Sequence, residues 1–498
     1  MADAEHLVIV GGGIAGLAAA HAAVARARER GGAVDVTVLE RSDRFGGNLV
    51  TERVDGFLLD GGPDSWVVTK PQATALAREL GLGGALVGTS EGSRRFYVAW
   101  GERLHEVPEG IVLGVPTRIA PLARTRLFTW RGKARMALEP LVPARRFEGD
   151  DDESIAGFAA RRLGREAAER LVAPLLGGIS AGDASDISVR AAFPQLVAME
   201  REHGSLVRGM RAARRARARA QATAGTAASG GKEGSAFVSL QGGVGQLVEA
   251  LVARLRADAV TLRARAPVQG LARREGGGWL LDLGGGDRLE ADAVLLAVPG
   301  HAAAALLRDV DATIAGTLAA IPYGSTATVF VGYRRADVAH PLDGVGFVVP
   351  RALGRPILAG TWVSSKWEGR APEGHVLLRA FFGGAWGEGV LENDDEALAR
   401  LARSELRAVM GLDAEPLFTR VFRFERASAQ MRVGHLARMR AVHQRLAQVA
   451  PRLRVAGGGY DGVGIPDCIR QGQEAARALL SPGVGGSPAA DVSVLARG

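Results

Sequence analysis

The sequence predicts a protein of mixed architecture, part α/β and part α+β, with a Rossmann-like domain, a mixed-sheet domain and a helical domain. Three observations support this prediction. A strand, a glycine-rich turn, a helix and a second strand follow one another over residues 6–40, the order that builds a parallel sheet. Residues 118–220 have a mostly helical pattern, and residues 323–383 are rich in strands and aromatic residues. Because 498 residues are too many for one ordinary core, we expect two or three domains.

The first strand, HLVIV, runs into Gly11, Gly13 and Gly16, which form a G-x-G-x-x-G turn. In such a turn the first glycine permits the tight bend, the second lets the backbone approach a pyrophosphate, and the third lets helix and strand pack closely. The helix over residues 14–30 then points its positive N-terminus at the phosphate. Glu40 ends the second strand, where a carboxylate can accept hydrogen bonds from both ribose hydroxyls. This order predicts a dinucleotide-binding domain and leaves NAD and FAD both open.

The remaining elements are predicted from the same kinds of pattern. A helix is expected to start at Ser154, after the acidic turn EGDDDE. A hairpin over residues 260–283 is expected to turn at Gly276–Gly278. The other expected segments are a connector of low complexity at 221–236, a strand at 291–299, helices at 394–410 and 435–450, and a disordered tail at 481–498.

The charge balance is basic. The formal net charge is +8, and only four of the 62 lysine and arginine residues are lysine. Such a balance suits an anionic membrane surface, nucleic acid or an acidic substrate. The densest basic run, RGMRAARRARARA at residues 208–220, has no interleaved aromatic residues and is typical of a solvated helix face. We therefore do not expect a nucleic-acid partner.

We expect a cytoplasmic protein without a metal site or an internal disulfide. The longest apolar stretch has 15 residues, 293–307, and contains Pro299 and His301, which is too short and too interrupted to span a bilayer. The N-terminus does not resemble a signal peptide. The single cysteine, Cys468, excludes an internal disulfide, and no H-E-x-x-H motif is present.

Further glycine turns favour FAD over NAD. Gly46–Gly47 come directly after the ribose acid in ERSDRFGG, and only a cofactor with a longer reach than NAD has a use for them there. The stretch LLDGGPDSW, residues 58–66, is another turn that exposes backbone. A third, GGGYDGVGIPDCI at 457–469, is nearly free of charge and leads into a helix. Glycine clusters before helices mark places where the backbone approaches a ligand closely.

The pattern G-x-G-x-x-G, Glu, R-x-x-R-x-G-G resembles the FAD-binding start of the amine-oxidase-like flavoproteins. Within that group, four stretches are similar to the oxygen-dependent porphyrinogen oxidases of haem synthesis. They are GGPDSW (61–66), SRRFYVAWGERLHEVP (93–108), LLGGISAGDASDISVRAAFP (175–194) and GGGYDGVGIPDCI. The resemblance covers nearly the whole chain, to about residue 480.

The resemblance implies a non-covalently bound FAD whose isoalloxazine end meets the C-terminal turn. The helix after that turn would aim its positive N-terminus at the flavin. Val268 matches a position whose backbone contacts adenine, although an ordinary core valine is the alternative interpretation. Cys468 is interpreted as a small buried side chain rather than a covalent flavin anchor. The expected cofactor residues are Gly11, Gly12, Gly13, Ile14, Ala15, Gly16, Glu40, Arg41, Gly46, Gly47, Asn48, Gly62, Pro63, Asp64, Ser65, Val268, Val463, Gly464 and Ile465.

The resemblance also implies three residues that contact the substrate. Arg95 matches a propionate-binding arginine; its neighbour Arg94 is the alternative, since strand alternation puts only one of them inside. Two solvated arginines are the competing interpretation. Gly178 matches a glycine whose carbonyl lies beside the reacting meso carbon, and Phe381 matches a ring-packing position. The chain departs from the family pattern at Val345, Val348, Ala429 and Met431, which puts substrate choice and rate in doubt.

The implied reaction is oxidation of a porphyrinogen to the porphyrin, with protoporphyrinogen IX slightly ahead of coproporphyrinogen III. Hydride leaves a meso carbon for the flavin, a pyrrole N–H proton is lost, and dioxygen is reduced to hydrogen peroxide in each of three cycles. The alternatives are a flavin amine oxidase or carotenoid desaturase, and a prenyl-binding escort of the same fold. The helical part around 107–200 would contact the inner face of the cell membrane peripherally. The sequence leaves a homodimer open.

We expect the FAD domain to be discontinuous, with other domains inserted between its parts. Its parts would be residues 1–92, 237–306 and 434–480. The remaining expected divisions are substrate-domain strands at 93–106, a helical domain at 107–220, a flexible linker at 221–236, a substrate domain at 307–433 and the tail at 481–498.

Overall fold

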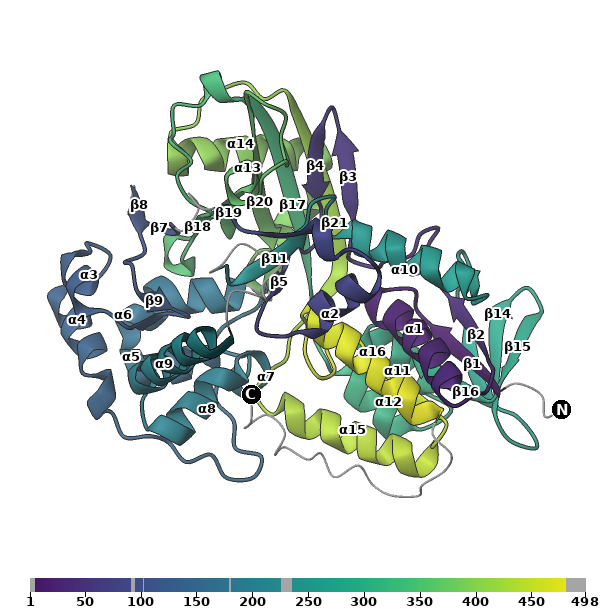
Figure 1. The fold of residues 1–498 in the computed structure, drawn as a ribbon. Helices are drawn as coiled ribbons and strands as arrows, with labels where there is room; N and C mark the ends of the chain where they lie inside the picture. The colour runs from purple at the N-terminus through teal and green to yellow at the C-terminus, as the bar shows by residue number, and fades with distance from the viewer. Residues whose placement is uncertain (1–4, 91–94, 102, 179–180, 225–234, 481–498) are drawn as a thin grey trace.

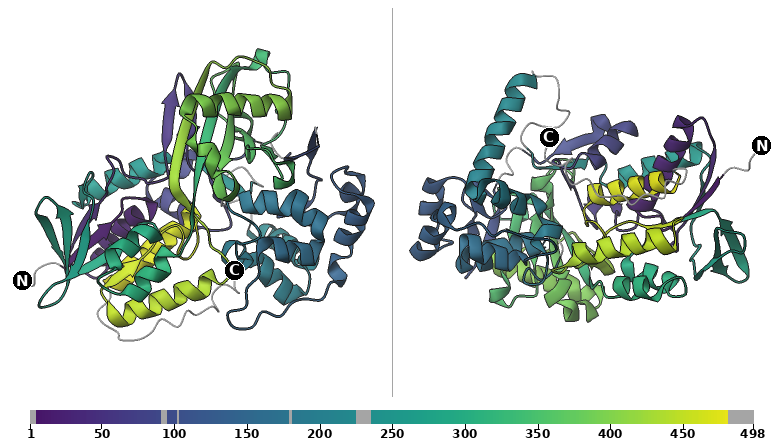
Figure 2. Two further views of the ribbon diagram at one scale, coloured as in Figure 1. Left: turned by 180° about the vertical axis from the view of Figure 1, so that it is seen from behind. Right: turned by 90° about the horizontal axis from the view of Figure 1, so that it is seen from below.

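The structure is a computed structural model, and it describes residues 5–90, 95–101, 103–178, 181–224 and 235–480. Most of the expected connector and the whole expected tail lie outside these ranges. Figure 1 shows three parts: a parallel sheet between helices at the lower right, a second sheet at the top, and a helical region at the lower left. The two further views in Figure 2 show the same three parts from behind and from below.

The parallel sheet has the strand order β12-β2-β1-β16-β22. Alternate residues of its central strand face opposite sides and are almost fully buried on both: Leu7 and Ile9 pack into one core, Val8 and Val10 into the other. A parallel sheet covered on both faces has such apolar strands. The strands are β1 (Glu5–Val10), β2 (Val34–Leu39), β12 (Thr261–Arg263), β16 (Ala293–Leu296) and β22 (Leu453–Val455).

Two sets of helices cover this sheet. The Leu7 side packs against α1 (Ile14–Glu29), α10 (Gly245–Ala257) and α16 (Ile465–Leu479). The Val8 side packs against α11 (Gly300–Leu307), α12 (Ala312–Ala319) and α15 (His435–Val449). Helices α1 and α16 touch backbone to backbone, because a Cβ added to Gly472 would lie 2.1 Å from the carbonyl oxygen of Ala15. The first and last described helices are therefore held together.

The second sheet has the order β21-β17-β20-β19-β18-β7-β8 and is mixed, since β7 pairs with β18 in parallel while the other pairs are antiparallel. One face packs on α14 (Asp395–Met410). The opposite face packs on the hairpin of β3 (Thr51–Val54) and β4 (Phe57–Asp60) and on the helical region. Its strands are β7 (Tyr97–Trp100), β8 (Arg103–Glu106), β17 (Tyr323–Arg334), β18 (Gly346–Val348), β19 (Ala359–Trp362), β20 (His375–Gly383) and β21 (Phe418–Ala429).

The expected elements are largely confirmed, with two corrections. The hairpin of β13 (Gly270–Arg273) and β14 (Trp279–Gly284) turns at Gly276–Gly278 as predicted, but residues 261–263 leave it and join the parallel sheet as β12. Helix α9 (Leu206–Ala224) extends into the expected connector, because alanine and arginine favour helix. A small sheet contains β5 (Trp66–Val67), β11 (Phe237–Leu240) and β6 (Leu86–Gly88), and β15 (Asp287–Ala291) pairs with β14.

The helical region comprises residues 119–224. Ser154 begins α5 as predicted, and its side chain accepts a hydrogen bond from the Gly157 N–H. A ten-residue π-helix, η3 (Ala168–Gly177), follows and ends beside Gly178. In the parts of the chain described, no helix is both long and apolar enough to cross a membrane. The other helices are α3 (Ile119–Arg124), α4 (Trp130–Ala137), η2 (Glu139–Leu141), α5 (Ile155–Leu163), α6 (Arg165–Ala167), α7 (Val189–Ala192), α8 (Pro194–His203) and α9 (Leu206–Ala224).

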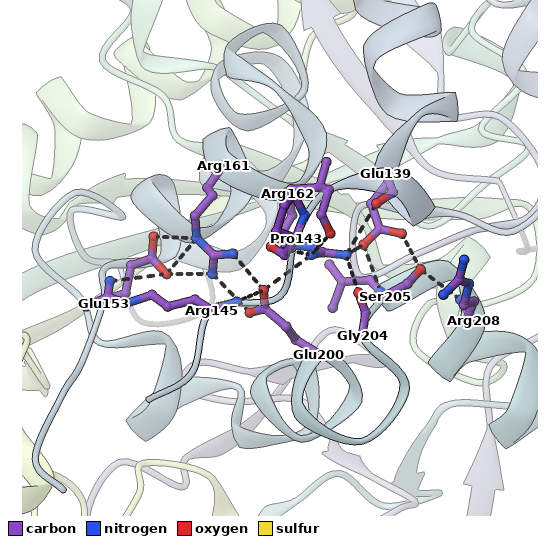
Figure 3. Close-up of polar contacts among 12 residues, drawn as sticks. Glu139, Pro143, Arg145, Glu153, Arg161, Arg162, Glu200, Gly204, Ser205 and Arg208 are labelled. Carbon is purple, nitrogen blue, oxygen red and sulfur yellow. Dashed lines mark hydrogen bonds and ion pairs between the residues drawn. The ribbon is translucent and has the colours of Figure 1, made fainter. Parts of the chain in front are cut away.

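A buried network of charges holds these helices together (Figure 3). Arg162 of α5 is fully buried between the carboxylates of Glu139 and Glu200. Glu139 also accepts hydrogen bonds from Ser205 Oγ at 2.6 Å and from the Leu206 N–H at 2.8 Å, so it caps the start of α9. Such a pair costs much to break, because removing one partner leaves the other charge buried and uncompensated.

Replacing Arg162 with methionine is therefore expected to lower the free energy of unfolding by about 3–5 kcal/mol. Urea unfolding followed by tryptophan fluorescence measures the change. The control is Arg211→Met, which removes an exposed arginine from the same region and is expected to change stability by about 0.5 kcal/mol or less. Equal effects of the two substitutions would contradict a structural role for the buried network.

Candidate active site

The carboxyl ends of the parallel strands meet at one edge, and the predicted turns lie there. Strand β1 leads into Gly11 and β2 into Glu40. The Glu40 carboxylate is buried and accepts hydrogen bonds from the backbone of Gly12 at 2.8 Å and of Ser42 at 2.8 Å. The second glycine turn closes on the first through the Gly46 N–H, which donates to the Gly12 carbonyl at 2.8 Å. Ligands bind at this edge of open α/β sheets.

The N-terminus of α1 provides an anion site. Its N-cap is Gly13, no side chain caps it, and its first turn holds no acidic residue. The first backbone N–H groups of this helix are therefore available to a phosphate. A Cβ on Gly16 would lie 1.9 Å from the carbonyl oxygen of Gly11, so only glycine lets the helix start so close to the strand. These residues fit the pyrophosphate of a dinucleotide.

The C-terminal turn, residues 457–464, reaches the same edge from the other end of the chain. A Cβ on Gly457 would lie 3.9 Å from that of Ala15, so the two distant glycine turns adjoin. Tyr460 is fully buried, and its hydroxyl donates to the Val298 carbonyl at 2.8 Å. The Tyr460 carbonyl lies 2.8 Å from His435 Nε2. Anchored on both sides, the turn leaves Val463 exposed, ahead of the buried Ile465 at the start of α16.

The turn at residues 61–65, between β4 and β5, is fixed by charges. Lys366 Nζ lies 2.7 Å from the Asp64 carboxylate, and the indole of Trp367 donates to it at 3.1 Å. Burial by itself would raise the pKa of Asp64, but Lys366 and Arg379 outweigh it and hold that pKa well below its usual range. Asp64 therefore stays ionised and bonded to the protein, which suits a residue that shapes the turn rather than one that moves protons.

Phe381 lies near this turn through Arg379, and Gly178 lies near the end of the same strand, β20. The Gly178 carbonyl accepts the Ala181 N–H at 3.2 Å, and the Ala181 carbonyl accepts the N–H of Ala385, just past β20, at 3.0 Å. Phe381 lies two residues before that end and is half-buried. The chain that follows Ala181 is fastened to the end of β21, because the Ser188 N–H donates to the Met431 carbonyl at 2.8 Å. The helical region, the seven-stranded sheet and the residues after β21 thus converge here.

Arg95 is not brought into this group. It precedes β7 and is exposed, and its guanidinium is paired with Asp343 and lies 3.7 Å from Glu106. Asp343 also accepts a hydrogen bond from Tyr97 at 2.9 Å, on the side of the sheet that packs on α14. Strand pairing places Phe381 on the opposite face. Arg94, the alternative, lies outside the described residues.

Val268, Cys468 and the residues that depart from the family pattern lie in different parts of the structure. Val268 is partly buried and lies two residues after Ala266, whose N–H donates to the Glu40 carbonyl at 2.8 Å. Burial raises the pKa of Cys468 to about 12, so its thiol is neutral and unreactive at physiological pH. Of the departures from the family pattern, Val348 lies on the Phe381 face, and Ala429 and Met431 are buried where β21 ends.

Two residues that hold the 61–65 turn in place were not predicted from the sequence. Lys366 pairs with Asp64 of that turn. Arg379 is 5% exposed and donates to the carbonyls of that turn. The one available signal was an arginine inside the apolar run HVLLRAFF, since a charge in a buried strand needs a partner. In the described ranges, no group of three or more histidine, cysteine, aspartate or glutamate side chains could hold a metal ion.

The fold and the glycine turns at the edge of the parallel sheet are those of a dinucleotide-binding protein with a second, mixed sheet. A family model described as flavin containing amine oxidoreductase matches residues 14–480. The coproporphyrinogen III oxidase of Bacillus subtilis is 36% identical over 477 residues, covering 96% of this chain and 98% of that protein. Protoporphyrinogen oxidase 1 of Arabidopsis thaliana is 29% identical, and the match covers 94% of this chain and 87% of that protein.

Solved structures agree. A crystal structure from Exiguobacterium sp. 255-15, named as a candidate protoporphyrinogen oxidase, has a TM-score of 0.82 and 32% identity, and covers 95% of this chain and 98% of that one. Cyclohexylamine oxidase from Brevibacterium oxydans has a TM-score of 0.68 at 18% identity, with 96% and 98% covered, and shows the shared fold alone. The chain belongs to the flavin-containing amine oxidoreductases. Its cofactor is FAD, as expected.

Proposed function

We propose that this protein oxidises a porphyrinogen to the porphyrin with bound FAD and dioxygen, releasing hydrogen peroxide. The observation that carries the proposal is the match, over nearly the full length of both chains, to proteins named coproporphyrinogen III oxidase at 31–36% identity. The approach of Phe381 to the 61–65 turn, and of Ala181 to the end of β20, supports it. Bound FAD supplies the two-electron redox chemistry.

The protein's own contribution is binding and orientation. We propose that the uncapped start of α1 holds the diphosphate and that Glu40 binds a ribose. The turns at 61–65 and 457–464 would hold the flavin end. Phe381, with Val348 and Ala359 on the same sheet face, would supply an apolar wall for the macrocycle. Holding the substrate against the cofactor in one pose lowers the activation barrier by several kcal/mol. The discontinuous domain division set out above belongs to the same proposal.

Coproporphyrinogen III is the substrate we place first. The relatives at 31–36% identity are named for it, whereas the plant relative named for protoporphyrinogen is 29% identical. This reverses the order expected from the sequence alone.

Oxidation of the two porphyrinogens, measured side by side by the rise of porphyrin fluorescence, tests the function. Purified protein loaded with FAD is expected to oxidise coproporphyrinogen III faster than protoporphyrinogen IX in air, with three peroxide molecules per porphyrin. Removal of oxygen should stop turnover. A flavin-loaded protein that is inactive on both compounds would contradict the proposal.

Arg95, which matches the family's propionate-binding position, remains our proposed contact for a substrate carboxylate. It lies on the sheet face opposite Phe381, so a carboxylate arm would have to extend beyond the apolar wall to reach it. The Arg95 guanidinium is paired with Asp343, so a substrate carboxylate has to displace that side chain. Arg95→Ala is expected to raise KM about tenfold, the low end of a charge-assisted hydrogen bond at about 1.5 kcal/mol. Asp343→Asn, which frees the arginine, is expected to lower KM. Flavin content serves as the control for both, and an unchanged KM in both variants would remove Arg95 from the site.

We also propose a peripheral membrane contact through the helical region. Large apolar side chains are exposed there on the adjoining elements α3, α4 and η2, including Trp130 at 74% and Leu141 at 74%. The exposed Arg124 and Arg131 lie in the same elements. Apolar side chains flanked by arginines suit the surface of an anionic bilayer.

Flotation with vesicles containing phosphatidylserine tests this contact. The protein is expected to float at low ionic strength and to be released by salt. The double variant Trp130→Ser, Leu141→Ser is expected to lose binding. Leu417→Ser, which changes an exposed leucine outside the helical region, just before β21, is expected to keep it. No flotation of the unaltered protein at low salt would contradict the contact.

A further inference from the structure

Beneath the turn at residues 61–65 the numbers of positive and negative charges are unequal. Asp60, Arg370 and Arg379 are buried, and Asp64 and Lys366 are partly buried. Lys366, Arg370 and Arg379 are the cations, and Asp60 and Asp64 are the carboxylates. Two pairs account for four of them: Arg370 lies 3.0 Å from Asp60 and Lys366 lies 2.7 Å from Asp64. Arg379 is left with no ion pair in the part of the chain that the structure describes. A buried charge without a carboxylate partner is costly, and its presence calls for a reason.

Arg379 is bonded to the turn and to Phe381 instead. Its Nη2 donates to the carbonyls of Gly61 at 2.5 Å and Gly62 at 2.7 Å. Its guanidinium lies 4.4 Å from the centroid of the Phe381 ring. These contacts join strand β20 to a turn that is more than 300 residues away in the sequence, and both were predicted to line the site. Arg379 is 5% exposed, and its Nε is buried without a partner among the described residues, so the protein encloses this side chain.

The positive charge persists despite the burial. Burial lowers the pKa of Arg379, with Asp64 and Asp60 opposing the change, to about 10. That value leaves the guanidinium protonated at neutral pH. Since the two carboxylates are already matched by two cations, the group as a whole carries one positive charge in a medium where screening is weak.

We propose that Arg379 is a positioning residue of the active site, which fixes the 61–62 turn and the Phe381 ring and whose buried positive charge favours the reduced, negatively charged form of the bound flavin. This inference rests on the proposed function for its cofactor site and adds an electrostatic role to it. Fixed charges near developing charge act without reorganisation, which makes them effective in a water-poor site. A cation near the flavin stabilises the reduced state more than the neutral oxidised state, and so raises the reduction potential.

The test compares two substitutions that separate charge from geometry. Arg379→Met removes the charge and keeps much of the length, whereas Arg379→Lys keeps the charge and loses the planar group that serves two carbonyls and covers the ring. The readouts are the reduction potential of the bound flavin against a reference dye and the dissociation constant of FAD from the apoprotein. The control is Arg162→Met, which deletes an equally buried arginine in the helical region.

Arg379→Met is expected to weaken binding of the reduced flavin about tenfold relative to the oxidised flavin, which is a fall in potential of about 30 mV. Arg379→Lys is expected to lower the reduction potential by no more than a third of the fall expected for Arg379→Met. Both are expected to weaken FAD binding about tenfold, and Arg162→Met is expected to leave the potential unchanged.

A folded Arg379→Met protein with unaltered potential and FAD affinity would overturn the inference. If that variant does not fold, Arg379→Lys decides, because unaltered FAD affinity in it would show that the two carbonyl contacts position nothing. Unaltered protein that binds FAD but oxidises neither porphyrinogen would refute the proposed function and leave these flavin measurements valid.

Discussion

The structure depends on one geometrical constraint, the parallel direction of the strands in the first sheet. Parallel strands end at the same edge, so the turns after β1, β2, β16 and β22 are gathered there whatever their distance in the sequence. A cofactor that spans this edge is met first by the glycines after β1 and last by the turn after β22. The close approach of α1 and α16, at Ala15 and Gly472, holds those two ends in register. The second sheet and the helical region are inserted between these strands and are positioned by them.

Charge is distributed differently in the inserted parts. In the helical region the buried arginine has two carboxylate partners, and Glu139 gains further hydrogen bonds from the start of α9, so the network is closed upon itself. Next to the 61–65 turn the charges do not balance. The first arrangement suits a scaffold, and the second suits a place where a negative charge appears during the reaction. The contrast between Arg162 and Arg379 is therefore informative, since both side chains are nearly fully buried.

The sequence predicted those features whose signals are local. Gly16, Glu40 and Ser154 were placed correctly because a turn, a strand end and a helix cap are each encoded within a few neighbouring residues. The resemblance to known flavoproteins extended this to the C-terminal turn. Contacts that join distant segments were not predicted, because no spacing in the sequence marks Lys366 as the partner of Asp64. The prediction that only one of Arg94 and Arg95 points inward assumed that both lie in a strand. Strand β7 starts only at Tyr97, and the Arg95 side chain is instead oriented by its ion pair with Asp343.

The position of β22 at one edge of the first sheet has a consequence for biosynthesis. That strand and the helix that follows it are made of residues 453–479, so they leave the ribosome after nearly all the rest of the chain. Until they arrive, β16 is an open edge, and the apolar face of α1 that α16 covers is bare. The nascent chain must therefore carry an open sheet edge from the end of β16 at residue 296 to the start of β22 at residue 453, and the uncovered face of α1 for longer still. Chaperone binding during that interval, and rapid proteolysis of chains truncated before β22, follow from the order of the strands alone.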